Sequence, residues 1–154
     1  MARPDKLFLD LDGVLADFDR GVEIVTGKRP DQQSTRDMWR ALSREPDFFG
    51  TLALMRDAKE LWDYCRPHRP VILTGLPLGN WAAAQKRRWV ANMLGEDVAI
   101  ITCMSKDKHR WSAPGHVLVD DREKTRESWE AKGGIFILHR AADRSIAALK
   151  ELGF

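Results

Sequence analysis

The amino-acid sequence predicts an α/β protein in three layers, with a parallel sheet between helices, and two observations carry this prediction. First, five short runs are almost wholly apolar, which is typical of strands that are buried on both faces. These runs cover residues 7–9, 71–73, 98–101, 117–119 and 135–138. Second, helical patterns separate the later runs, and this alternation predicts parallel strands joined by right-handed crossovers.

The helices expected between these strands are marked by apolar periodicity and by residues that favour helix ends. Residues 58–65 place apolar side chains at positions i, i+3, i+4 and i+7, which is the spacing of one helix face. Asn80 is expected to cap a helix that runs to Leu94 and ends at the glycine after it. Two further helices are expected at residues 123–132 and 143–152.

The connection between the first and second strands has about 60 residues, far more than one helix requires. Within it, an apolar stripe ends at Gly27, and a capping box at Ser34 begins a second helix. We expect residues 18–55 to form a small helical cap inserted after the first strand, which closes a site and excludes water. Residues 1–17 and 56–154 would then form the α/β core.

Length and composition exclude several classes of protein. The 154 residues suit one domain, and a net charge of +2 is too small to indicate a nucleic-acid surface by itself. No apolar run approaches the roughly 20 residues of a membrane span, and the N-terminal residues lack the apolar region of a signal peptide. Cys65 and Cys103 lack metal-ligand spacing. We expect reduced thiols in a cytoplasmic protein, with a disulfide as the alternative.

Polar side chains follow each of the first four expected strands. Because the carboxyl ends of parallel strands meet at one edge of a sheet, where doubly wound folds bind their ligands, we expect these side chains to lie together. The segments after the strands contain Asp10, Asp12 and Gly13 after the first, Thr74 and Gly75 after the second, Ser105, Lys106, Asp107 and Lys108 after the third, and Asp120 and Asp121 after the fourth.

Four carboxylates at one edge would raise one another's pKa unless a cation held them ionised, and Mg²⁺ suits an all-oxygen site that a substrate phosphate shares. With Mg²⁺ and a lysine neutralising the phosphoryl oxygens, one carboxylate can attack phosphorus and form an aspartyl-phosphate. A second carboxylate can protonate the leaving oxygen and later activate water. Taken singly, these aspartates could instead be turn residues or helix caps. A D-x-D pair also occurs in glycosyltransferases that bind a metal–nucleotide.

These residues resemble the haloacid dehalogenase (HAD) superfamily of phosphohydrolases. The resemblance implies a Rossmann-like core with a small cap, and it implies that Asp10 is the nucleophile and Asp12 the general acid and base. Its order and spacing hold over nearly the whole chain. The similar segments are Leu9–Val14, Thr74, Lys108 or Lys106, and Val119–Asp121.

The same resemblance implies roles for the other residues at the strand ends. Thr74 would hold the phosphoryl group, and the lysine would offset its charge. Mg²⁺ would be held by Asp10, by the main-chain carbonyl of Asp12, and by Asp120 and Asp121, of which Asp121 would bind it most directly.

Within the superfamily, the chain is similar to the 5′(3′)-deoxyribonucleotidase branch. This similarity favours Lys108 over Lys106 and implies that Phe18 and Trp39 line a nucleobase pocket. Gly75 would also bind substrate, at a position where the branch usually has a serine. The similar segments are residues 11–18, Phe48–Phe49, Lys86 with Trp89–Val90, and Asp107–Lys108.

Lys86 falls within the apolar arc of its expected helix, among side chains that should face the sheet. It is either a lysine whose stem is buried while its ammonium reaches water, or a second cation that faces the substrate phosphate.

Six tryptophans and four histidines remain to be placed. Trp39 lies in the expected cap, whereas the other five tryptophans are expected to pack in the core. The histidines show no ligand spacing, so we expect them in loops or on the surface.

Three functions agree with these features. The one we favour is a Mg²⁺-dependent phosphomonoesterase that acts on a nucleotide or another small phosphorylated substrate, as a monomer or homodimer without a membrane partner. A phosphatase of nucleic-acid ends is the second, although the near-neutral charge argues against it. The third is a non-catalytic phosphoacceptor module, although receiver domains of that kind place their acidic pair at the first strand.

Overall fold

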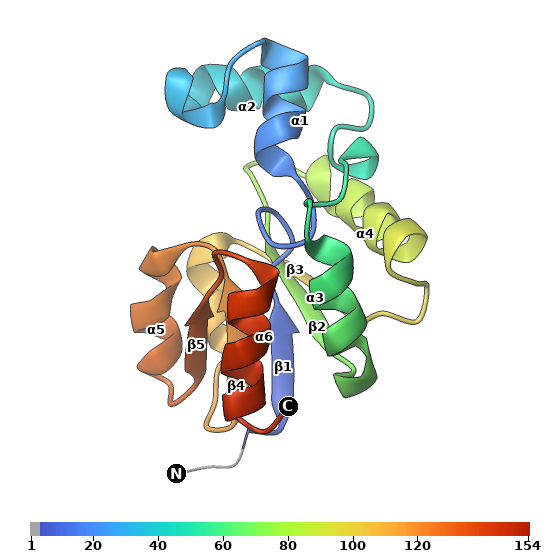
Figure 1. The fold of residues 1–154 in the computed structure, drawn as a ribbon. Helices are drawn as coiled ribbons and strands as arrows, with labels where there is room; N and C mark the ends of the chain where they lie inside the picture. Colours follow the sequence, from blue (N-terminus) through green and yellow to red (C-terminus); the bar gives the residue numbers. More distant parts are fainter. Residues whose placement is uncertain (1–3) are drawn as a thin grey trace.

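The computed structural model describes residues 4–154, which contain a five-stranded sheet in the order β3-β2-β1-β4-β5 (Figure 1). Every neighbouring pair of strands is parallel. The predicted α/β fold is therefore confirmed. The strands are β1 (Lys6–Leu9), β2 (Val71–Gly75), β3 (Ile100–Cys103), β4 (His116–Asp120) and β5 (Ile135–Leu138).

Helices cover both faces of this sheet and divide the core into two hydrophobic clusters. Side chains alternate along a strand, so Leu7 and Leu9 face one layer while Phe8 faces the other. The first layer consists of α3 (Ala58–Cys65), α4 (Ala82–Met93) and α6 (Ala142–Glu151), and the second of α5 (Arg126–Glu130) and the 3₁₀ segment η4 (Ser105–Trp111).

Two helices lie beyond the carboxyl ends of the strands (Figure 1). They are α1 (Phe18–Thr26) and α2 (Thr35–Arg44). Gly27 ends α1 with a φ of 76°, and the Ser34 hydroxyl accepts a hydrogen bond from the Asp37 N–H at 3.1 Å, as the sequence predicted.

The two connections between this helical segment and the core lie side by side, because Ala16 pairs with Leu54 as an antiparallel bridge. A 3₁₀ turn, η2 (Phe49–Thr51), leads back to the core. There the Phe49 N–H donates to Gln85 Oε1 of α4 at 2.9 Å. The cap boundaries at residues 18 and 55 stay a prediction.

The helix start predicted at Asn80 is wrong. Trp81 occupies the N-cap position of α4 without a side-chain cap, and its indole N–H donates to the Leu78 carbonyl at 3.2 Å. Asn80 is therefore part of the preceding turn. The helix expected at 123–132 is also shorter, since a 3₁₀ turn, η5 (Glu123–Thr125), precedes α5.

The third strand begins at Ile100 rather than at residue 98. The Val98 N–H donates to the Gly95 carbonyl at 3.2 Å in a turn, so pairing with β2 starts only at Ile100, opposite Ile72. Cys65 and Cys103 are free thiols. In the part of the chain that the structure describes, no helix has the length and apolar character that a membrane crossing requires.

Candidate active site

The loop after β1 is a tight turn that places two aspartates at the edge of the sheet. The N–H groups of Leu15 and Ala16 both donate to the Leu11 carbonyl, at 2.9 and 3.0 Å. Gly13 has a φ of 81°, and a Cβ there would overlap the Asp121 carboxylate. A side chain at position 13 would therefore be strained and would displace Asp121.

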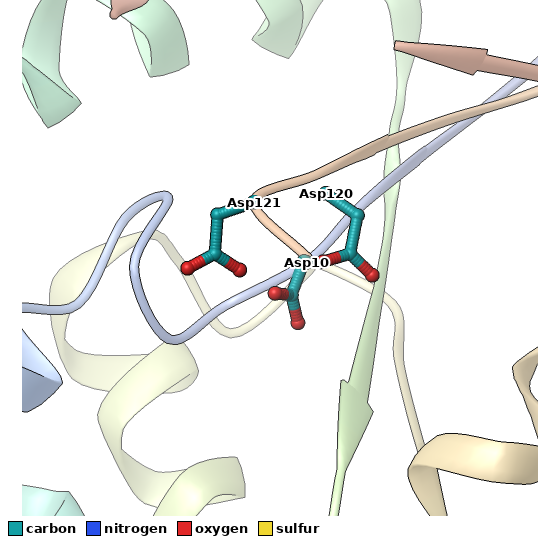
Figure 2. Close-up of side chains that lie close together, drawn as sticks. All are labelled: Asp10, Asp120 and Asp121. Atoms are coloured by element: carbon teal, nitrogen blue, oxygen red, sulfur yellow. The ribbon is translucent and has the colours of Figure 1, made fainter. Parts of the chain in front are cut away.

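Three carboxylates converge at this edge, as Figure 2 shows. Asp10 follows β1, whereas Asp120 and Asp121 lie at the end of β4, and one oxygen from each lies within 4.8 Å of the other two. Asp120 also accepts a hydrogen bond from the Arg122 N–H at 2.9 Å. Asp121 Oδ1 is buried without a hydrogen-bond partner among the described residues, so this cluster has an oxygen to spare for a ligand.

Lys108 of η4 lies between two of these carboxylates. Its Nζ is 2.8 Å from Asp10 Oδ1 and 2.9 Å from Asp120 Oδ2, and the side chain is 3% exposed. Burial alone would lower the pKa of Lys108, but Asp10 and Asp120 raise it above its usual value. Lys106 is exposed, so the geometry favours Lys108 of the two lysines that the sequence left open.

The acids of the cluster have different pKa values. Burial, followed by repulsion from Asp10, raises the pKa of Asp121 to about 8 and that of Asp120 to about 6. Burial would also raise the pKa of Asp10, but the charge and hydrogen bond of Lys108 hold it below its usual value. Without a cation, the cluster therefore keeps a proton on Asp121 at neutral pH.

This donor set fits Mg²⁺. All three groups offer carboxylate oxygens, which hard divalent cations prefer, and a cation would replace the proton on Asp121 and give its unpaired oxygen a partner.

A second lysine holds the other aspartate of the loop. Lys86 of α4 places its Nζ 2.8 Å from Asp12 Oδ2, 2.8 Å from Thr74 Oγ1 and 2.7 Å from the Gly75 carbonyl. Its side chain is 1% exposed. Burial raises the pKa of Asp12, although Lys86 acts in the opposite direction. The structure thus brings Asp12, Thr74, Gly75 and Lys86 together beside the three-carboxylate cluster. The prediction that the Lys86 ammonium reaches water is wrong, because the whole side chain is buried.

Four aromatic rings form a cluster that reaches Lys86 through Phe49. Phe18 lies 5.6 Å from Trp39 between ring centroids, and Phe49 stacks on Trp81 at 5.4 Å with 29° between the planes. The Lys86 ammonium lies 4.5 Å from the Phe49 centroid, so these rings border the site. Phe18 and Trp39 are thus part of this aromatic cluster, and their role in a nucleobase pocket stays a prediction.

Trp81 packs against the core, as expected, but it also joins the aromatic cluster beside the site, which the sequence did not indicate. Its ring lies 6.4 Å from Trp39 and is half-buried. Its place directly before α4, after the polar end of β2, was the available signal.

Ser105 was expected at the end of the third strand, but the sequence assigned it no role. A Cβ at Gly75 would overlap the Ser105 hydroxyl, so the side chain that follows β3 fills the space that Gly75 leaves open. His139 lies in the loop after β5, as one of the two predicted possibilities has it, but it is buried next to Asp120. Its N–H donates to the Asp120 carbonyl at 2.9 Å, and its Nδ1 lies 2.7 Å from the Ser145 hydroxyl of α6.

No family model matches the chain, and no curated protein matches it. Solved structures do match its fold. A HAD-superfamily hydrolase from Ehrlichia chaffeensis is 12% identical with a TM-score of 0.58, over 99% of this chain and 98% of that one. A HAD family hydrolase from Deinococcus radiodurans R1, with bound phosphate and sodium, is 18% identical with a TM-score of 0.54, over 99% and 90%.

A third structure is the L-2-haloacid dehalogenase of Xanthobacter autotrophicus, which is 14% identical with a TM-score of 0.56, over 86% of this chain and 76% of that one. At these identities the likeness establishes the fold alone. The chain has the α/β fold of HAD-superfamily hydrolases, and that fold carries more than one reaction.

Proposed function

We propose that the protein is a HAD-type phosphomonoesterase that uses Mg²⁺ and forms an aspartyl-phosphate on Asp10. The observation that carries this proposal is Lys108, which lies 2.8 Å from Asp10 and 2.9 Å from Asp120, beside Asp121. The lysine keeps Asp10 ionised, as a nucleophile must be, and adds positive charge where an anionic phosphate would approach.

In the first half of the proposed reaction, an Asp10 oxygen attacks phosphorus and the bond to the ester oxygen breaks. The departing oxygen takes the proton of Asp12, so an alcohol leaves and Asp12 becomes a carboxylate. In the second half, Asp12 takes a proton from water, whose oxygen attacks phosphorus. The bond between phosphorus and Asp10 then breaks, which releases inorganic phosphate and restores both aspartates.

Asp10, Asp120 and Asp121 would hold Mg²⁺ together with the main-chain carbonyl of Asp12. When bound, Mg²⁺ would neutralise the phosphoryl oxygens and so reduce their repulsion of the Asp10 carboxylate. Thr74 and Gly75, which end β2 at the same edge of the sheet, would bind the phosphoryl group.

We propose a nucleotide, or another small phosphate ester, as the substrate. The half-buried rings of Phe18, Trp39 and Trp81, which gather around the buried ring of Phe49, offer faces on which a base can stack. The same proposal places the reaction in the cytoplasm, where the two free thiols stay reduced.

The test is phosphate release from nucleotides, sugar phosphates, an aryl phosphate and 5′-phosphorylated oligonucleotides, with Mg²⁺ or with chelator. Asp10→Asn is expected to lose turnover while its circular dichroism is unchanged. Asp31→Asn, at an exposed aspartate of the helical segment, is the matched control and should behave as wild type.

Other outcomes identify the alternatives. A phosphoprotein that forms without turnover would indicate a phosphoacceptor module, and a salt-sensitive preference for oligonucleotides would indicate a phosphatase of nucleic-acid ends. Chloride release from 2-chloropropionate without phosphate release would indicate a dehalogenase. Wild-type turnover by Asp10→Asn would contradict the proposal outright.

A further inference from the structure

The Lys86 ammonium has no N–H left to offer a substrate. A lysine ammonium carries three donors and no acceptor. Three oxygens of this chain lie within 2.8 Å of Nζ, namely Asp12 Oδ2, Thr74 Oγ1 and the Gly75 carbonyl. The Phe49 ring covers the ammonium at 4.5 Å from its centroid. A phosphate oxygen could reach Lys86 only by displacing one of these partners.

The two oxygens of Asp12 have different surroundings. Lys86 holds Oδ2, whereas Oδ1 is buried and has no hydrogen-bond partner among residues 4–154. A buried polar atom without a partner is unfavourable, so proteins rarely keep one without a use for it. Oδ1 is therefore the oxygen of Asp12 that is free to exchange a proton.

We propose that Lys86 is a positioning residue that fixes Asp12 through Oδ2, so that Oδ1 delivers the proton to the leaving oxygen. This inference rests on the proposed function and assigns Lys86 a role other than phosphate binding. When Oδ1 gives its proton to the departing oxygen, Asp12 becomes a carboxylate beside the Lys86 ammonium. The same contact then holds Asp12 in place while Oδ1 takes a proton from water.

The test compares substrates that need a proton on the leaving oxygen with one that does not. Lys86→Met is expected to lower the rate of leaving-group release in the first turnover of an alkyl phosphate, before the shared hydrolysis of the aspartyl-phosphate, by about 10²–10⁴-fold, the usual contribution of a general acid. For 2,4-dinitrophenyl phosphate, whose leaving group departs as a stable anion, the loss should be at least about tenfold smaller. KM should change little for either.

Two variants complete this comparison. Arg87→Met changes an exposed cation on the same helix, which donates to Thr102 Oγ1 at 3.1 Å, and should leave both substrates unaffected. Asp12→Asn, like Lys86→Met, should slow the alkyl phosphate more than 2,4-dinitrophenyl phosphate. The double variant should lose no more activity than Asp12→Asn alone, because both changes remove the same function, proton donation by Asp12. Equal losses on both substrates, or a loss confined to KM, would overturn the inference.

A crystal structure of the wild-type protein with Mg²⁺ and vanadate provides a second test that needs no variant. Nζ of Lys86 should remain on Asp12 Oδ2, Thr74 and Gly75, whereas a direct contact between Nζ and vanadate in place of Asp12 would overturn the inference. Failure of the proposed function would look different, since the wild type would then show no turnover that depends on Asp10.

Discussion

The two buried lysines of the site act on their aspartates differently. Lys108 lies between the carboxylates of Asp10 and Asp120, and it holds the pKa of Asp10 down against the effect of burial. Lys86 divides its donors between one carboxylate and two uncharged oxygens, and burial raises the pKa of Asp12 in spite of it.

A lysine contact alone therefore does not decide the charge of a buried carboxyl group. Asp10 and Asp12 are two residues apart, yet their surroundings lower the pKa of the first and raise the pKa of the second. Opposite shifts of this kind are what a nucleophile and a general acid need at the same pH.

Replacing Lys108 should have the largest effect. Lys108→Met would leave Asp10 and Asp120 buried without their cation, at a cost of about 3–5 kcal/mol in the free energy of unfolding. The pKa of Asp10 would rise, and turnover should fall by at least about 10²-fold. Urea unfolding and phosphate release measure the two effects. Lys106→Met, at an exposed lysine, should match the wild type. Equal unfolding midpoints for the two variants would show that Lys108 does not offset the buried charges of Asp10 and Asp120.

Gly13 and Gly27 separate the effect of an added side chain on the acidic cluster from its effect on the backbone alone. Both have a positive φ, of 81° and 76°, but a Cβ at Gly13 would overlap Asp121, whereas nothing lies within 4 Å of one at Gly27. Gly27→Ala should cost only backbone strain, about 1–2 kcal/mol. Gly13→Ala should cost more and should also abolish the rise in Tm that Mg²⁺ gives the wild type. If Mg²⁺ raises Tm equally in both variants, Asp121 does not hold the ion.

Asp121→Asn should stabilise the protein without metal while weakening its response to Mg²⁺. The pKa of Asp121 is about 8 in the folded protein against an ordinary value of 3.8. Between these values the folded state binds a proton that the unfolded chain releases, so the free energy of unfolding falls as pH rises from about 4 to 8. Asparagine carries no such penalty.

At pH 8, chelator-treated Asp121→Asn should therefore have a higher free energy of unfolding than the wild type, by on the order of 1–2 kcal/mol, and a higher unfolding temperature. Both differences should shrink toward pH 5. With Mg²⁺ the order should reverse, since only the wild type gains the full binding energy. Thermal unfolding at both pH values, with and without Mg²⁺, measures this. A constant difference across pH would mean that Asp121 does not carry the proton.

Much of the cluster could be predicted because each of its parts is local in the sequence. An apolar run indicates a buried strand, and the first polar residue after the run marks the end of that strand. A parallel sheet brings these strand ends to one edge. Asp10, Asp120 and Asp121 were expected together on that basis, and the structure places one oxygen of each within 4.8 Å of the others.

The contacts that sequence reasoning missed depend on how distant segments pack. Trp81 contacts Trp39 only because α2 lies over the turn before α4, and no periodicity encodes that approach. Ser105 fills the space beside Gly75 because β3 pairs with β2 in one register. The burial of His139 likewise requires Ser145, which belongs to the next helix.

The aromatic rings belong to the Lys86 side of the comparison, and changes there should have the smallest effect. Phe49 is the ring over the Lys86 ammonium, and Trp81 stacks on Phe49. Replacing Trp39 or Trp81 leaves the contact between Phe49 and Lys86 in place, so base binding should change while proton transfer does not. Trp39→Ala or Trp81→Ala should raise KM for nucleotides about tenfold, since stacking of one base contributes about 1–3 kcal/mol. KM for glycerol phosphate and kcat for both substrates should stay near wild type. Leu78→Ala, which alters an exposed residue of the same turn, serves as the control. Equal changes in KM for both substrates would mean that these tryptophans only hold α2 against the core.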